Sequence, residues 1–229
     1  MFFRYAAAAR PDRPHRKSWD LRFLIVTISR EYGAAAQAVA RALAAVLGYR
    51  LVDEELPRLI AAKLGTSTDV VESLSDRAAG FGERLLAGFA SAVPEVAAPA
   101  EPPHEDLTEA YRREAERLIA TAAQAGNVVI LGRLGNVILG ARPDLVRVFV
   151  YAPLAWRIRN VSASLGWDAA TARTEIDRID DARRTLAREQ YRMAWGDIRN
   201  YDLAVNTARY GVDGAAAVIA AAVHAAQPA

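Results

Sequence analysis

Five short apolar runs alternate with helical patterns along the chain. The runs are Phe23–Ile28, Tyr49–Asp53, Asn127–Gly132, Leu145–Ala152 and Tyr201–Asn206. Three of them, Phe23–Ile28, Asn127–Gly132 and Leu145–Ala152, are largely apolar and rich in β-branched residues, which is typical of strands buried on both faces of a sheet. The helical patterns between and after them cover residues 34–48, 54–65, 107–126, 168–195 and 211–226. Strands that alternate with helices predict an α/β fold whose five strands form a parallel sheet flanked by helices.

The chain divides into a leader and a single domain. Residues 1–20 lack the alternation and predict a flexible N-terminal leader, and residues 21–229 form one α/β domain. The apolar run of the leader is short and interrupted by Arg4, unlike a secretory signal. No apolar stretch approaches the ~20 residues that a membrane span needs. We therefore expect a cytoplasmic protein without a membrane partner. A short contact of the leader with a membrane or with a partner stays open.

Composition and charge narrow the classes of function. The chain has no cysteine and 3 histidines far apart in sequence, which excludes disulfides and thiolate zinc sites and argues against a histidine metal site. All of the 29 basic residues except Lys17 and Lys63 are arginines. Arginine binds phosphate through a planar fork, so anionic partners fit this bias, as does a composition bias without function. A net charge of +2, with acids interleaved among the arginines, argues against a nucleic-acid partner.

The turns after the strands hold the candidate chemistry, because ligands of parallel sheets bind beyond the carboxyl ends of the strands. The turn Ser29–Gly33 does not carry the GxxxxGK[ST] pattern of a phosphate loop and keeps only Gly33. By its pattern alone it is a tight turn capped by Ser29. Arg133 directly follows a strand and Gly132. Its side chain either reaches across the sheet edge to an anion or stands exposed in a glycine-rich turn.

The charged segment 168–195 allows two interpretations. Arg183 and Arg184 are adjacent, and Asp180 lies one turn earlier. Asp180 and Arg184 have the i,i+4 spacing of a surface ion pair on a solvated helix face. Alternatively, several arginines near a phosphate site would neutralise a phosphoryl group during its transfer.

The motifs taken together resemble the cytidylate kinase-like family. ISREYG, GYRLVDEEL, VVILGRLGNVIL, LVRVFVYAPLAWRI, IDDAR and NYDLAVNT occur in the family's order over residues 22–225. The resemblance implies a three-layer fold like that of P-loop nucleoside monophosphate kinases. It further implies a helical and Pro-rich insertion for the monophosphate at residues 54–107 and a helical lid at roughly residues 157–199. The implied reaction moves the γ-phosphoryl group of ATP, used with Mg²⁺, to a nucleoside monophosphate such as CMP. No protein side chain is expected to hold a metal.

The resemblance also assigns site residues. Arg133, with Gly132 before it, would hold the acceptor phosphate, and Arg157 and Arg183 are lid-side arginines that would bridge the phosphates at transfer. These three arginines are the expected catalytic residues. The start of the phosphate loop and the remaining nucleotide-binding positions comprise Ser29, Arg30, Glu31, Tyr32, Gly33, Asp53, Arg184 and Asp202.

The chain departs from the family directly after this turn. Family members typically continue with Ser-Gly-Gly-Arg, whereas this chain has Ala34, Ala35, Ala36 and Gln37. Alanine in the left-handed region costs about 1–2 kcal/mol, and alanine is the best helix former. We therefore expect the next helix to start at or just after Gly33 and the phosphate nest to be shortened. Arg30 is a candidate to replace the lost charge, although the sequence leaves its direction open.

Two classes of function follow. The retained arginines favour a nucleotide-dependent phosphotransferase that binds ATP and a nucleoside monophosphate. The lost glycines favour the alternative, a catalytically impaired pseudokinase that binds nucleotides or another protein. The sequence leaves the acceptor, the effect of residues 34–37 on ATP binding, the role of the leader and the oligomeric state open.

Overall fold

A computed structural model of the chain describes residues 24–53, 55–68 and 104–226. Within these ranges one parallel sheet has the strand order β2-β3-β1-β4-β5. The strands are β1 (Ile25–Arg30), β2 (Arg50–Val52), β3 (Val128–Leu131), β4 (Leu145–Tyr151) and β5 (Leu203–Asn206). All five fall within or overlap the predicted runs, so the predicted sheet is confirmed. The predicted leader and most of the predicted insertion lie outside the described residues.

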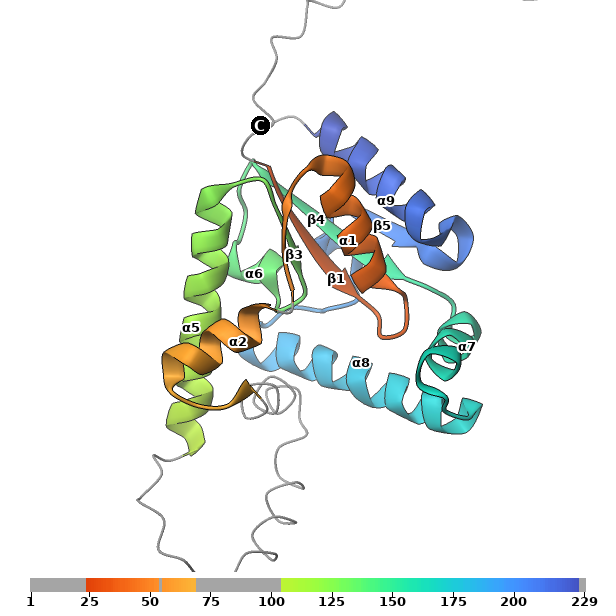
Figure 1. Ribbon diagram of the computed structural model, residues 1–229, viewed down its shortest axis with the longest axis horizontal. Coiled ribbons are helices and arrows are strands. Elements are labelled where there is room, and N and C mark those ends of the chain that lie inside the picture. Colours follow the sequence, from red (N-terminus) through yellow and green to blue (C-terminus); the bar gives the residue numbers. More distant parts are fainter. Residues whose placement is uncertain (1–23, 54, 69–103, 227–229) are drawn as a thin grey trace, which may run out of the picture.

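Helices cover both faces of the sheet, and a pair of helices lies at its carboxyl edge (Figure 1). The helices are α1 (Ala36–Leu47), α2 (Glu55–Leu64), α5 (His104–Ala125), α6 (Gly135–Ile138), α7 (Leu154–Leu165), α8 (Ala169–Tyr191), η2 (Ile198–Asn200) and α9 (Thr207–Ala225). Of these, α7 and α8 occupy the predicted lid region. In Figure 1, α8 runs beneath the ends of the strands.

The central strands separate two hydrophobic cores. Val26 and Ile28 face one core together with Leu43 of α1 and Ile219 of α9. The other core lies on the opposite face and contains Ile25, Ile60 of α2, Ile119 of α5 and Ile130. Alternate residues of β1 therefore serve different cores, which explains why this run is apolar throughout.

The first strand is longer at its carboxyl end than the sequence pattern predicts. Ser29 and Arg30 belong to β1 and pair with Phe149 and Val150 of β4. The predicted turn Ser29–Gly33 is therefore wrong at its start, because the partner strand extends far enough to keep both residues in the sheet. The turn itself comprises residues 31–35.

The predicted helix start at Gly33 is also wrong. Helix α1 begins at Ala36, and Ala35 adopts the left-handed conformation, with φ 56° and ψ 22°. The preceding carbonyl groups are held by other elements: the Asn160 amide donates to the carbonyl of Gly33 at 2.9 Å, and the Thr207 hydroxyl donates to that of Ala34 at 2.9 Å. The turn therefore keeps a shape that suits glycine, and tertiary hydrogen bonds offset the strain of about 1–2 kcal/mol. Helix α1 therefore starts later than the expected position at or just after Gly33 and does not shorten the turn.

Helix α9, in contrast, begins earlier in the chain than the predicted residue 211. Asn206 accepts a hydrogen bond from the backbone N–H of Ala208 at 3.0 Å and caps a first turn that starts at Thr207. Gly211, with φ 67° and ψ −176°, then kinks the helix. The sequence pattern missed this first turn because it precedes the kink.

The same substitution in α1 and in the turn before it should have opposite effects on stability. We expect Ala35→Gly to raise the free energy of unfolding by about 0.5–1 kcal/mol, because relief of the left-handed strain exceeds the added unfolded-state entropy. Ala38→Gly, at an exposed position within α1, should lower it by about 1 kcal/mol. Urea unfolding of both variants measures the difference. Equal losses would contradict the strain at Ala35.

Candidate functional site

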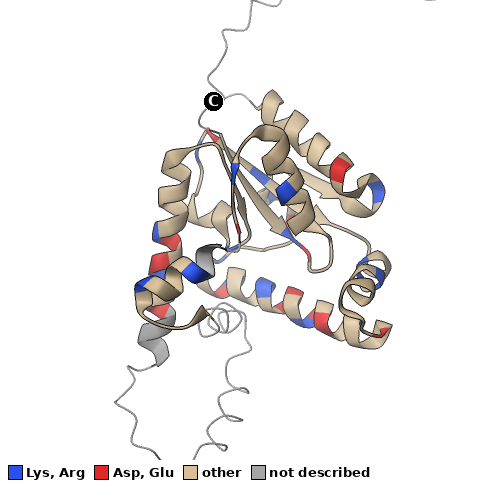
Figure 2. Cartoon of the chain, in the orientation of Figure 1, with Lys and Arg blue, Asp and Glu red and all other residues tan. Residues whose placement is uncertain are grey.

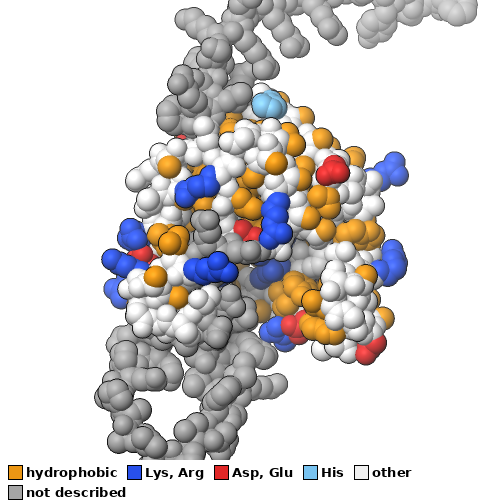
Figure 3. All heavy atoms as spheres, in the orientation of Figure 1, with side chains coloured by type: hydrophobic (Ala, Val, Ile, Leu, Met, Phe, Trp, Pro, Cys, Tyr) orange, Lys and Arg blue, Asp and Glu red, His pale blue; other side chains and the backbone are white. Residues whose placement is uncertain are grey.

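A cavity of about 420 Å³ lies where β1 and β3 end, between α5 and α8. Five arginines contribute to its lining: Arg30, Arg112, Arg133, Arg178 and Arg183. Among the described residues that line it, Glu175 is the only acid. In the space-filling view a basic side chain is visible in a recess of the surface, above helices α7 and α8 (Figure 3). The cavity is thus suited to an anionic ligand.

Most of these arginines are oriented by a protein partner. Arg133 donates to the hydroxyl of Tyr111 on α5 at 2.7 Å. Arg183 donates to the backbone carbonyl of Arg30 at 2.9 Å, and its guanidinium lies 5.9 Å from the centre of the Tyr32 ring. Two more arginines bind acids on their own helices. Arg112 donates to Glu116 at 2.7 Å, and Arg178 donates to Glu175 at 2.8 Å.

Two pKa shifts mark the burial of this site. Burial, followed by the charge of Arg183, lowers the pKa of Arg30 to about 9, so Arg30 remains protonated at neutral pH. Burial also raises the pKa of Tyr191 to about 12, and the Tyr191 hydroxyl donates to Glu116 at 3.0 Å. At neutral pH the cavity therefore contains a protonated Arg30, whose charge is disfavoured by burial, and a neutral Tyr191.

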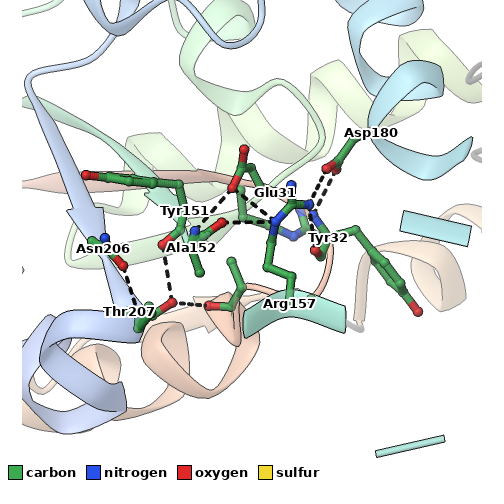
Figure 4. Close-up of polar contacts among 12 residues, drawn as sticks. Glu31, Tyr32, Tyr151, Ala152, Arg157, Asp180, Asn206 and Thr207 are labelled. Carbon is green, nitrogen blue, oxygen red and sulfur yellow. Dashed lines mark hydrogen bonds and ion pairs between the residues drawn. The ribbon is translucent and has the colours of Figure 1, made fainter. Parts of the chain in front are cut away.

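Beside the cavity, a buried ion pair holds the β1–α1 turn against helices α7 and α8 (Figure 4). Arg157 of α7 donates to Asp180 of α8 at 2.6 Å and to the carbonyl of Tyr32 at 3.1 Å. Asp180 accepts from the Tyr32 backbone N–H at 2.8 Å. Glu31 accepts from the backbone N–H of Ala152 at 3.1 Å and lies 3.3 Å from Arg157. We call Arg157, Asp180 and Glu31 the loop clamp.

The clamp corrects the predicted pair of Asp180 and Arg184. Asp180 is only 2% exposed and binds Arg157, whereas the exposed Arg184 pairs with Asp181. Figure 2 shows acidic and basic residues interleaved along α8, a sequence pattern that is typical of a solvated helix face. The sequence does contain a signal for the burial of Asp180. This residue follows the buried Ala172 and Ile176 at spacings of four residues, which places all three on the same face of the helix.

The structure brings some of the expected site residues together and leaves others apart. Those that line the cavity are Ser29, Arg30, Tyr32, Gly132, Arg133 and Arg183. Arg157, Glu31 and Gly33 lie next to it in the turn and clamp. A Cβ added to Gly33 would lie 2.8 Å from Val161, so α7 packs closely on the turn.

Three further expected residues lie outside the lining of the cavity and also outside the turn and the clamp. The Asp53 carboxylate accepts from the Gln37 amide at 3.0 Å, and Asp202 pairs with Arg147 in the amino-terminal half of β4 at 2.9 Å. The third is Arg184 on the outer side of α8. The sequence missed Tyr111, Glu175, Arg178 and Tyr191 as lining residues because helices α5 and α8 meet only in the folded chain.

The β1–α1 turn lacks the side chains of a phosphate loop. Residues 31–37 contain neither the lysine of such a loop nor the Ser or Thr that binds Mg²⁺. The nearby carboxylates of Glu31, Asp53 and Asp180 each accept a hydrogen bond from the protein. Across the described ranges, no group of three or more His, Asp or Glu could hold a metal ion.

Comparison with known proteins points to one family. The profile of the cytidylate kinase-like family matches residues 25–209. Cytidylate kinase of Halobacterium salinarum is 32% identical over 111 residues, which are 48% of this chain and 57% of that protein. Cytidylate kinase of Natronomonas pharaonis is 27% identical over 205 residues, 90% of this chain and 92% of that protein. The match to the Halobacterium enzyme thus spans little more than half of its length.

Solved structures share the fold. An uncharacterized protein from Eubacterium ventriosum has a TM-score of 0.63 at 20% identity, covering 88% of this chain and 98% of that chain. Shikimate kinase from Bacteroides thetaiotaomicron has a TM-score of 0.51 at 13% identity, with the same coverage. Among the described residues, no helix is both long enough and apolar enough to span a membrane.

Two neighbouring aspartates should differ sharply in their effect on stability. Asp180→Asn removes the buried counter-charge of Arg157, so we expect it to lower the free energy of unfolding by about 3 kcal/mol or more. Asp181→Asn removes only an exposed pair and should change it by less than about 1 kcal/mol. Chemical denaturation of the two variants tests the clamp. Similar small losses would show that the pair of Arg157 and Asp180 does not hold the lid.

Proposed function

We propose that this chain, which belongs to the cytidylate kinase-like family, is a nucleotide-dependent phosphotransferase. In this proposal it moves the γ-phosphoryl group of ATP to a nucleoside monophosphate, with CMP as the expected acceptor. The observation that carries the proposal is the excess of positive charge in the cavity, which has five arginines and one acid in its described lining. A phosphate monoester carries a charge of about −1.5 to −2 near neutral pH, which this excess would balance.

The cavity has a polar and an apolar part that together fit a nucleotide. Arg133 and Arg183 contribute guanidinium groups from two elements, the turn after β3 and helix α8. Leu134, Ile138 and Trp195 contribute apolar side chains to the lining. Phosphate fits the guanidinium fork, and a ribose and base fit an apolar wall. This arrangement supports Arg133 as a phosphate-binding residue and Arg183 as a residue that stabilises charge at transfer.

The β1–α1 turn fits the phosphates of the donor. No side chain caps the start of α1, and its first turn contains no acid, so the helix dipole favours an anion there. Ala35 adopts the left-handed conformation that a glycine at this position would favour. The clamp gives Arg157 a positioning role, because it binds the turn and the lid. ATP with Mg²⁺ is the donor that the family implies.

A second candidate function is nucleotide binding without transfer. Residues 31–37 contain neither the lysine nor the hydroxyl of a phosphate loop, and the Gln37 amide is engaged by Asp53. A chain that holds a monophosphate and lacks these groups would be a pseudokinase. The retained shape of the turn favours the phosphotransferase.

A phosphoryl-transfer screen separates the two. The purified chain is incubated with ATP, Mg²⁺ and each of CMP, dCMP, UMP, AMP and GMP, and diphosphate products are resolved by chromatography. We expect product from at least one acceptor, and we expect Arg133→Ala to lower kcat/KM about 10²–10³-fold. Arg188→Ala removes an exposed arginine of α8 and serves as the matched control.

The outcomes decide between the candidates. Product from the wild-type chain, lost in Arg133→Ala and kept in Arg188→Ala, supports the phosphotransferase and the role of Arg133. Full turnover in Arg133→Ala would remove that role. Binding of a nucleotide without product from any acceptor would contradict transfer and support the pseudokinase.

A further inference from the structure

We propose that Arg30, seated on Gly132, supplies the phosphate-binding cation that the β1–α1 turn lacks. The ligand class is a phosphoryl group or polyphosphate at the junction between the turn and the cavity. The inference rests on the proposed function, because it assumes that phosphoryl groups enter this site. It adds a pair of residues at the ends of two neighbouring strands. Arg30 binds the phosphoryl group, and Gly132 leaves space for the Arg30 guanidinium.

Arg30 and Gly132 are in close contact at the carboxyl edge of the sheet. Arg30 ends β1, and Gly132 follows β3, whose residue Leu131 pairs with Ile28. The Gly132 N–H donates to the Ile28 carbonyl at 2.8 Å, which fixes the two strand ends relative to each other. A Cβ added to Gly132 would lie 1.8 Å from Nη1 of Arg30 and 3.0 Å from its Cζ. Only glycine leaves room for the guanidinium in this position.

The guanidinium of Arg30 differs from the others in the cavity. Within residues 24–53, 55–68 and 104–226, no carboxylate or carbonyl accepts a hydrogen bond from it at hydrogen-bond distance. By contrast, Arg133 is bound to Tyr111 and Arg183 to the carbonyl of residue 30. Guanidinium has five N–H donors, and a charge removed from water is unfavourable unless it is paired. The Arg30 side chain is therefore prepared for an acceptor from outside the described part of the chain.

Neighbouring charges point to the same type of ligand. Arg183 and Arg133 both act on Arg30 as like charges, and together with burial they lower its pKa. The opposing effect of Asp53 is smaller than that of burial and of Arg183. Three guanidinium groups near one point repel each other until an anion enters. A phosphoryl group satisfies all three through charge-assisted hydrogen bonds.

Arg30 fills a gap that the sequence leaves in the turn. Phosphate loops place a lysine at the start of the helix, but residues 24–53 contain no lysine and α1 begins with Ala36 and Gln37. The Gln37 side chain binds Asp53. The cation thus comes from the strand that precedes the turn. Because a guanidinium fork contacts two phosphoryl oxygens at once, lysine at position 30 would not be equivalent.

Binding of tripolyphosphate tests this pair without relying on catalysis. Isothermal titration calorimetry compares the wild-type chain with Arg30→Met, Gly132→Ala, the double variant and Gly48→Ala. We expect Arg30→Met to weaken binding about 10–100-fold. Gly132→Ala should weaken it to a similar degree, because the new methyl group displaces the guanidinium. The double variant should bind no more weakly than Arg30→Met, since both changes remove one contact.

Gly48→Ala is the matched control for backbone strain. Gly48 has a φ of 67°, close to the 74° of Gly132, but an added Cβ at residue 48 meets no atom within 4 Å. It should bind tripolyphosphate as the wild-type chain does. Circular dichroism checks that each variant is folded, and Arg30→Met alone decides the case if Gly132→Ala does not fold.

Each result either supports or overturns the inference. Equal affinity of Arg30→Met and the wild-type chain would overturn it, and nucleotide transfer by the wild-type chain would then leave the proposed function intact. Additive losses in the double variant would show that Gly132 does not act through Arg30, which also overturns the pair. A wild-type chain that binds neither tripolyphosphate nor any nucleotide would overturn the inference and the proposed function together.

Discussion

The buried ion pair of Arg157 and Asp180 is the contact on which the rest of the site depends. Two charges removed from water must satisfy each other and the polar groups around them, or the fold loses several kcal/mol. This pair does so by binding both the carbonyl and the N–H of Tyr32. It thereby connects helices α7 and α8 to the turn after β1. Since Arg183 lies one helical turn after Asp180, the same contact directs Arg183 toward the cavity.

Acids balance the arginine of the clamp, whereas arginines predominate in the adjoining cavity. In the clamp, Arg157 faces two carboxylates, Asp180 and Glu31. In the adjoining cavity, the arginines outnumber the acids among the described lining residues. The first arrangement gives rigidity, and the second gives affinity for an anion. A kinase needs both, because phosphoryl transfer depends on positioning and on neutralising charge rather than on covalent chemistry of the protein.

The sequence predicts the sheet better than the site. Apolar runs such as Val128–Leu131 are buried on both faces whatever surrounds them, so composition and length suffice. The start of α1 depends on Asn160 and Thr207, which hold the turn from other elements. The helix propensity of alanine alone therefore predicts a start of α1 that is too early. The burial of Asp180 and the contact of Arg30 with Gly132 likewise follow from helix packing and strand register, which local patterns do not contain.

The central claim is that nucleotide phosphate binds among the arginines at the ends of β1 and β3. A crystal structure of the chain grown with CMP tests it most directly. We expect the phosphate of CMP to lie in the cavity, with its oxygens about 3 Å from guanidinium nitrogens of Arg30, Arg133 and Arg183. CMP bound elsewhere on the protein, or with its phosphate in solvent and these three arginines uncontacted, would contradict it.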